Sequence, residues 1–329
     1  MKILYRVRTG MIRSGSGMVF LWAGLALACA QQVDLEKLEP ISLEWVGQLA
    51  HEQINESSGL IRSRLWEGVL WTHNDSGDEA RLFAVDFKGQ PLFPDFVTQQ
   101  SYQGLRIGDA VNVDWEDIAT DGDGNLYIAA CGNNANMRRD LGIYRVREPN
   151  PESAIVTRVD QYFRFQWPDQ SAFPPEEMNF DCEAIFWANG SLYLLTKHRS
   201  DTWTKLYRMD TLDALSLNVP TLIARFDVGG MVTGADVTPD GRRLAVLTYD
   251  HVWVFEMDST LESEHRSTWF DARVGVIRTV REQVQQCEGI TFLDDQTLMI
   301  SNEQQDLFIL DLNAMHWVEG DAHAHPPSS

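Results

Sequence analysis

The chain has 329 residues, of which 48 are acidic and 27 are basic, and its formal net charge is −21. A surface this negative repels nucleic acid and anionic membranes and favours cations. The length suits one large domain, because no Pro-, Gly- or Ser-rich linker divides the chain. We therefore predict a single domain over residues 31–318 and a disordered tail over residues 319–329.

The N-terminus has the features of an export signal. Three arginines precede the apolar run Met18–Cys29, which is too short to span a bilayer, and small residues allow cleavage before Gln31. We predict a signal peptide over residues 1–30 and a secreted or periplasmic protein without a stable transmembrane segment. The alternative is a lipoprotein acylated at Cys29, because "ALAC" resembles a lipobox. Removal of the leader takes the net charge to −25.

Five segments of the chain repeat one pattern. Each has a small or acidic residue before an aliphatic anchor, then a turn at Gly, Asn or Asp, then an apolar strand. A third β-branched or aromatic strand follows each time, and a fourth follows most of them, as in QYFRFQW, TLIARFDV and HRSTWFDA. This predicts an all-β fold, a single β-propeller of four-stranded blades. The anchors are Leu60, Ile118, Ile185, Val237 and Ile290.

The repeats predict five blades. A sixth would have to lie between Ile118 and Ile185, a stretch that reads more simply as one blade with a Pro-rich loop. The last repeat has only three strands before the tail. We therefore expect the N-terminal strand Ile41–Ala50 to pair beside Asp306–Leu312 and to close the ring.

The motif Asn-x-Asp-x-Glu occurs twice, as NVDWED from Asn112 and as NFDCEA from Asn179. The first strands of propeller blades line a central channel, so Glu116, Glu183 and Glu288 are expected together at one mouth of it. Two like charges about 6 Å apart repel by roughly 3 kcal/mol at an effective dielectric of about 20. A proton, a basic side chain or a bound cation must offset that repulsion.

Oxygen donors of Asp, Glu and Asn suit Ca²⁺ best, so we predict calcium as the cofactor. Glu116 and Glu183 are expected to share the ion or its waters. The alternative is that these acids hydrogen-bond the loop amides that join neighbouring blades. The full set of predicted ligands is Glu116, Glu183, Asn74, Asp75, Asn134 and Glu288.

Several segments resemble a group of exported bacterial β-propeller proteins: ESSGL, WTHNDSGDEARLFAVD, VDWEDIA, IYRVREP, DCEAIFW and TGADVTPDG. The resemblance covers nearly the whole chain after the leader. That group has Gly-Asp-Asn in the second blade, whereas this chain has Asn133 in place of the Asp. The chain is more distantly similar to phytase-like, gluconolactonase-like and strictosidine-synthase-like propellers, and this similarity implies Ca²⁺ at the channel mouth.

Two functions fit these features. The first is a monomeric, calcium-stabilised propeller that binds a small molecule or an extracytoplasmic protein at its acidic face. The alternative is a metal-dependent hydrolase of phosphoesters or lactones, in which His73 or His198 moves the proton. Whether the chain is an enzyme stays open, because no nucleophile elbow, phosphate loop or dinucleotide fingerprint is present.

Three cysteines remain once the leader is removed. Cys131 ends the second strand of one repeat and Cys182 begins the next repeat, whereas Cys287 lies two repeats further on. We therefore expect any intramolecular disulfide to join Cys131 to Cys182.

Overall fold

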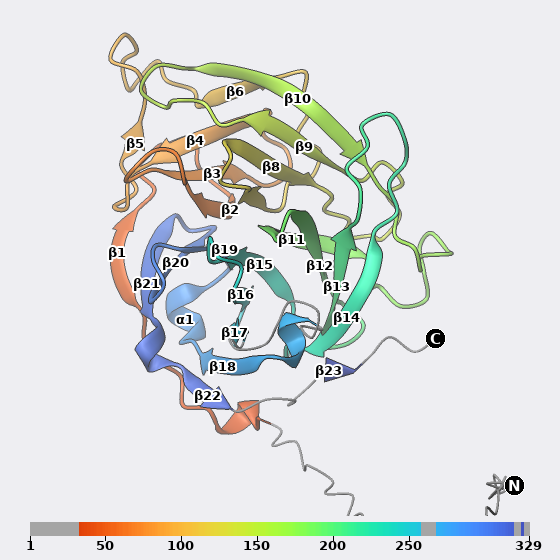
Figure 1. Cartoon of the computed structure of the whole chain (residues 1–329). Helices are drawn as coiled ribbons and strands as arrows, with labels where there is room; N and C mark the ends of the chain where they lie inside the picture. Colours follow the sequence, from red (N-terminus) through yellow and green to blue (C-terminus); the bar gives the residue numbers. More distant parts are fainter. Residues whose placement is uncertain (1–32, 258–267, 319–323, 326–329) are drawn as a thin grey trace, which may run out of the picture.

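The computed structural model describes residues 33–257, 268–318 and 324–325. The predicted signal peptide and the lipidation alternative at Cys29 lie outside these residues. The described residues form an all-β structure of several sheets (Figure 1). No helix among them is long and apolar enough to cross a membrane.

One sheet joins the two ends of the chain. Its strands, in spatial order, are β1 (Glu44–Gln48), β21 (Asp306–Asp311), β20 (Thr297–Asn302) and β19 (Cys287–Phe292). β1 runs antiparallel to β21, with Trp45 opposite Phe308. The predicted pairing of the N-terminal segment beside the last repeat is therefore confirmed over Glu44–Gln48.

Two further sheets each contain four consecutive antiparallel strands and a short C-terminal strand. The first contains β11 (Asp181–Ala188), β12 (Ser191–Lys197), β13 (Trp203–Met209), β14 (Thr221–Asp227) and β23 (Ala324–His325). The second contains β15 (Val232–Val237), β16 (Arg243–Thr248), β17 (His251–Glu256), β18 (Arg273–Arg278) and β22 (His316–Val318). Within the tail that was expected to be disordered, residues 324–325 thus pair with β14.

The remaining sheet combines two repeats. Its order is β2 (Ser57–Arg62), β3 (Leu70–Asn74), β4 (Arg81–Val85), β6 (Leu105–Gly108), β10 (Val156–Arg164), β9 (Gly142–Arg147), β8 (Asn125–Ala130) and β7 (Ile118–Thr120). β5 (Pro91–Leu92) pairs with β4. The two repeats merge at their outer edges, because β10 pairs antiparallel with β9 and parallel with β6.

The short helices among the described residues are η1 (Leu35–Lys37), α1 (Arg281–Val284), η3 (Trp269–Asp271) and η4 (Leu312–Ala314). The segment HRSTWFDA was expected to be a fourth strand, and its first three residues lie outside the described ones. Its remaining residues contain η3 instead, and the fourth strand of that sheet is β18. The Thr268 side chain accepts a hydrogen bond from the Phe270 amide at 2.9 Å and begins the helix. Trp269 and Phe270 are buried in the core, which accounts for the strand-like composition of this segment.

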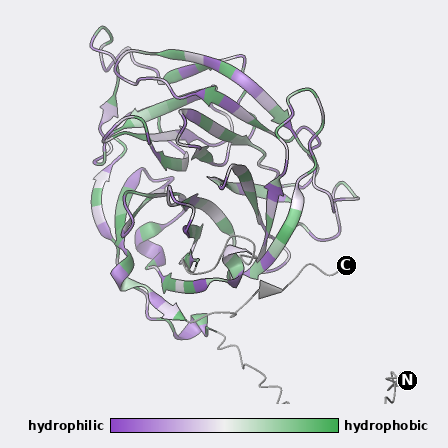
Figure 2. Cartoon of the chain, in the orientation of Figure 1, coloured by the Kyte–Doolittle hydropathy of each residue, from purple (hydrophilic) through white to green (hydrophobic). Residues whose placement is uncertain are grey.

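The first strands of the repeats lie innermost. Contacts between them run from β2 to β7, β11, β15 and β19 and return to β2. Each buried apolar cluster draws on two adjacent repeats, as where Phe186 shares a cluster with Phe255 and Leu60 shares one with Met299. Hydrophobic residues are accordingly distributed over the strands of all the sheets (Figure 2). The arrangement is propeller-like, with the same end of every inner strand directed to one face.

Candidate metal centre

Backbone irregularities place the three glutamates. The register between β11 and β12 shifts at Glu183, and the register between β19 and β20 shifts at Glu288. Just before β7, the Glu116 amide donates to the Ala129 carbonyl at 3.0 Å, while the Ala129 amide donates to the Asp117 carbonyl at 2.8 Å. Two residues opposite one define a β-bulge, which re-aims a side chain. All three glutamates thus lie at the same kind of irregularity near the start of an inner strand, as expected for side chains that share a face.

Five carboxylates gather where the inner strands β7 and β11 begin, and we call them the acid cluster. Oxygens of one triple lie within 4.8 Å of one another, and oxygens of a second triple do the same. The two triples share Glu116, which is 3% exposed. At that separation two charges repel by roughly 3.5 kcal/mol at an effective dielectric of about 20. The first triple is Asp75, Asp114 and Glu116, and the second is Glu116, Asp181 and Glu183.

Gly132 makes room for the cluster. A Cβ at this position would lie 1.9 Å from Oε1 of Glu116 and 2.6 Å from Oδ2 of Asp114. Any side chain here would displace those carboxylates. The glycine of the Gly-Asn-Asn sequence therefore serves the site through its lack of a side chain.

Basic side chains compensate the two triples unequally. Lys197 Nζ lies 3.0 Å from Glu183, and Arg199 Nη2 lies 2.9 Å from Asp181. In the first triple the nearest cation is Arg138, whose Nη1 lies 3.9 Å from Asp114. Within the described residues, no donor or cation contacts the Glu116 carboxylate. The first triple is thus the less neutralised of the two.

The pKa values follow from this crowding. Burial, and then Glu183 and Asp75, raise the pKa of Glu116 well above its usual range. Burial and Asp75 also raise the pKa of Asp114 to about 6. Although burial alone would lower it, the pKa of Lys197 is raised, chiefly by Glu183. Without another cation, the cluster therefore holds protons at mildly acidic pH.

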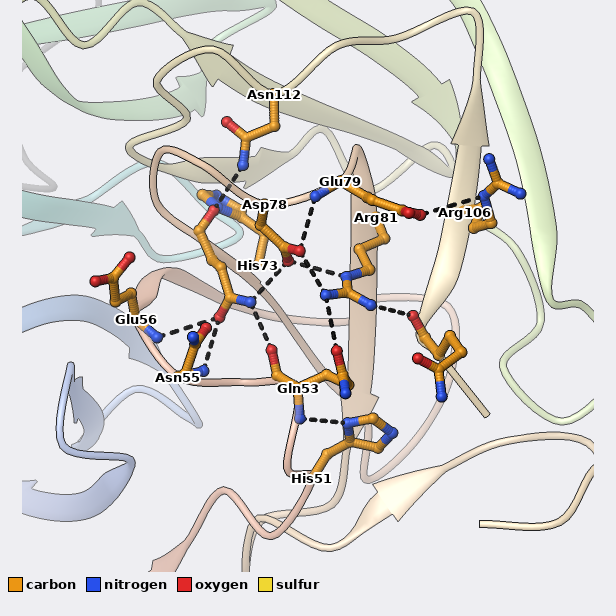
Figure 3. A network of polar contacts seen from close by, with 12 residues as sticks. His51, Gln53, Asn55, Glu56, His73, Asp78, Glu79, Arg81, Arg106 and Asn112 are labelled. Carbon is orange, nitrogen blue, oxygen red and sulfur yellow. Dashed lines mark hydrogen bonds and ion pairs between the residues drawn. The ribbon is translucent and has the colours of Figure 1, made fainter. Parts of the chain in front are cut away.

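Asn74 is directed away from the cluster. Its Oδ1 accepts from the Glu56 amide at 3.3 Å, and its Nδ2 donates to Asp78 Oδ2 at 2.7 Å. Asp78 in turn pairs with Arg81, in a network at the end of β3 (Figure 3). The side chain of Asn74 is therefore occupied by the turn that follows β3, whereas its neighbour Asp75 joins the cluster.

The other two predicted ligands lie at the edge of the site. Asn134 is exposed, and its Oδ1 accepts a hydrogen bond from Arg199. Glu288 is buried and accepts a hydrogen bond from the Tyr249 hydroxyl at 2.9 Å, while that hydroxyl accepts from Lys197 at 3.2 Å. Glu288 belongs to the polar network of Lys197 rather than to either triple.

Neither histidine candidate reaches the site. His73 is fully buried, its ring lies edge-on to Trp115, and its Nδ1 lies 3.0 Å from the Asn74 carbonyl. His198 is buried too, with Nδ1 2.6 Å from Asp201 Oδ1. Burial lowers the pKa of both rings to about 4. Both are therefore neutral, enclosed groups at neutral pH.

Asp114 and Asp181 were not among the predicted ligands, although the motif contains both. Alternate residues of an extended segment face the same side, so an Asp two positions before the Glu was a usable signal. Asp117, in contrast, binds backbone amides between neighbouring repeats, which is the role considered above as the alternative to metal binding. Its carboxylate accepts from the amides of Ile118 and Ile185, both at 2.8 Å, and so joins adjacent repeats.

Cys131 and Cys182 lie close together, with Cys131 Sγ 3.7 Å from the Cys182 carbonyl oxygen. All three described cysteines are buried free thiols. The two cysteines that were expected to form any disulfide therefore lie close together, and no disulfide joins them in this structure.

No protein-family model and no curated protein matches this chain. Among solved structures, it is similar to a chain of the "Crystal Structure of Mitotic Checkpoint Complex", with 11% identity and a TM-score of 0.35. The match covers 77% of this chain and 62% of the other, so this chain spans less than two thirds of that length.

Proposed function

We propose that this chain is an exported five-bladed β-propeller that holds one Ca²⁺ ion at the acidic mouth of its channel and binds a ligand or protein partner on that face. The ion would be held by Asp75, Asp114 and Glu116. Asp181 and Glu183, whose charges are already balanced by Arg199 and Lys197, would then lie beside the ion without binding it.

The observation that carries this proposal is the carboxylate of Glu116, which is buried and has no donor or cation partner in the part of the chain that the structure describes. An ionised carboxylate in such a position is costly unless a cation offsets its charge. Ca²⁺ lies about 2.4 Å from each ligand oxygen, so oxygens up to about 4.8 Å apart can share one ion. The first triple meets that limit. Its ligand atoms are all oxygens, which favours Ca²⁺ over Zn²⁺.

Two observations support five blades. The five inner strands contact one another in a closed sequence, and β1 pairs with β21. Each inner strand begins one antiparallel unit of four strands, and β1 supplies the fourth strand of the last unit. In such a ring the end of β3 and the start of β7 lie at the same mouth, so Asp75 lies close to Asp114 and Glu116 although they belong to adjacent units.

The test compares thermal melting in EDTA and in millimolar Ca²⁺. We expect Ca²⁺ at about 100 times its Kd to raise Tm by roughly 5 °C in a domain of this size. Glu116→Gln should abolish the response. In EDTA this variant should melt at or above the native Tm, because it removes a repelled charge. In Ca²⁺ it should melt below the native protein.

The matched control is Asp123→Asn with Glu152→Gln, which removes charge at two exposed positions. It should keep the native Ca²⁺ response. Identical melting of the native protein in EDTA and in Ca²⁺ would contradict the proposal. So would a Glu116→Gln variant that is destabilised in EDTA, because that result assigns the carboxylate a tethering role.

The hydrolase alternative needs an accessible base, and neither His73 nor His198 is accessible. We therefore propose binding rather than catalysis. A screen with p-nitrophenyl phosphate and a δ-lactone, each with and without EDTA, tests this choice. Turnover that EDTA removes and Glu116→Gln abolishes would overturn the binding proposal in favour of the hydrolase.

A further inference from the structure

A cavity of about 1010 Å³ lies at the other end of the inner strands. Its walls come from the turns after β2, β15 and β19, whose opposite ends face the acid cluster. A strand of six residues separates the two ends by about 20 Å. The volume is at the upper end of the range for small-molecule sites. This cavity is therefore distinct from the proposed metal centre.

Two arginines line the cavity, and each is hydrogen-bonded to a backbone carbonyl. Arg64 donates to the Val237 carbonyl at 3.0 Å, and Arg62 donates to the Leu293 carbonyl. Within the described residues, neither guanidinium forms an ion pair. A guanidinium has five donors, so each keeps donors free while a backbone carbonyl holds it in place. Arg62 ends β2 and Arg64 follows two positions later, the spacing of residues that share a side of an extended segment.

Acidic residues also line the cavity, and one of them, Asp236, interacts electrostatically with Arg64: burial raises the pKa of Asp236, and the Arg64 guanidinium lowers it. Asp236 is buried, and its carboxylate accepts from the Val237 amide, the Thr291 hydroxyl and the Phe292 amide at 2.7, 2.8 and 2.9 Å. The others, Glu67, Asp294 and Asp295, are exposed. The two arginines are half-buried, whereas these three acidic residues are more exposed.

The rest of the lining includes apolar surface. Leu65, Trp66 and Phe292 contribute to the same cavity. A flat apolar body can contact these side chains while an anionic group accepts from the guanidiniums. The exposed acids disfavour polyanions, since repulsion grows with the charge of the ligand.

We propose that this cavity is a second binding site, for a small organic anion with one carboxylate on a flat apolar body, with Arg62 and Arg64 as the anion-binding groups. The assignment does not depend on the proposed metal centre, because no residue is shared between the two.

Benzoate is the probe, measured by isothermal titration against the purified protein in Ca²⁺ and in EDTA. We expect saturable one-to-one binding that is the same in both buffers and about tenfold or more tighter than the binding of benzyl alcohol, its neutral analogue. Arg62→Gln with Arg64→Gln should weaken benzoate binding by at least about tenfold. The matched control, Arg158→Gln with Arg164→Gln, removes the same charge at exposed positions and should bind like the native protein.

Both arginines also hold backbone carbonyls, so a second variant guards against misfolding. Leu65→Asp adds a carboxylate at a position 47% exposed and keeps both guanidiniums. It should weaken benzoate binding and leave benzyl alcohol unaffected. Equal affinities for benzoate and benzyl alcohol, no saturation up to roughly 10 mM, or unchanged benzoate affinity in the Arg62 and Arg64 double variant would each overturn the proposal.

Discussion

Gly132 shows how a residue without a side chain can determine a site. Its position is filled on one side by the carboxylates of Glu116 and Asp114. Gly132→Ala should therefore push these groups apart and weaken Ca²⁺ binding. Displacement of two ligands is expected to remove most of the Ca²⁺-dependent rise in Tm, which melting curves in EDTA and Ca²⁺ would measure.

The control for this substitution is Gly230→Ala, because a Cβ at Gly230 meets only ordinary contacts at 3.7 Å from Thr248. It should keep the native Ca²⁺ response. A Gly132→Ala variant with the full response would show that the ion, if bound, lies elsewhere.

The cysteines offer a second test at the residue scale. Cys131, Cys182 and Cys287 are all fully buried, and burial raises the pKa of each thiol. The thiolate is the reactive form, so alkylation of the folded protein should be slow and should become fast only in denaturant. Mass spectrometry after iodoacetamide treatment measures this. Rapid labelling of any of the three in the native state would contradict the described burial.

At the scale of elements, buried aspartates fasten one repeat to the next. Asp117 connects β7 to β11, and Asp236 connects β15 to β19. Asp117→Ala would leave the buried amides of Ile118 and Ile185 without an acceptor. We expect a loss of about 3 kcal/mol in the free energy of unfolding, measured by urea denaturation. Asp123→Ala, at an exposed turn, should cost almost nothing, and equal losses in the two variants would refute the tether.

The sequence pattern predicted most strands because alternating apolar residues and turn residues are local features. The pairing of Glu44–Gln48 with β21 followed from counting strands in the last repeat. HRSTWFDA misled the prediction because buried aromatic residues suit a strand as well as a short helix capped by Thr268. Composition alone does not distinguish the two.

The site was less predictable than the fold. Glu116 and Glu183 were identified from spacing, but their final direction depends on bulges, which are set by register across strands. Neutralisation of Glu183 and Asp181 depends on the positions of the Lys197 ammonium and the Arg199 guanidinium, which long flexible side chains carry. Asn74 illustrates the same limit, because its amide satisfies a turn rather than the channel.

At the scale of the whole molecule, two sets of groups make stability depend on pH in opposite directions. Asp114, with a folded pKa of about 6, binds protons in the folded state that the unfolded chain has released. Its contribution is therefore present below the unfolded value near 3.8 and is lost as pH rises through 6. His73 and His198, with pKa values of about 4, act oppositely, because the unfolded chain takes up protons first as pH falls below 6.5.

Because these contributions oppose each other, the pH dependence of the total stability does not isolate the acid cluster. The difference in Tm with and without Ca²⁺ does. The histidines do not contact the acid cluster, so their contribution is the same with and without the ion and cancels in the difference. Ca²⁺ competes with protons for Asp75, Asp114 and Glu116, whose pKa values are all raised, first of all by burial. We therefore expect the rise in Tm caused by Ca²⁺ to be larger at pH 7.5 than at pH 5, as measured by melting curves at a fixed Ca²⁺ concentration. The Asp123→Asn and Glu152→Gln control should follow the native protein, and Glu116→Gln should show no rise at either pH. A rise of equal size at both pH values would mean that binding releases no protons, and the acid cluster would then not be the site of the ion.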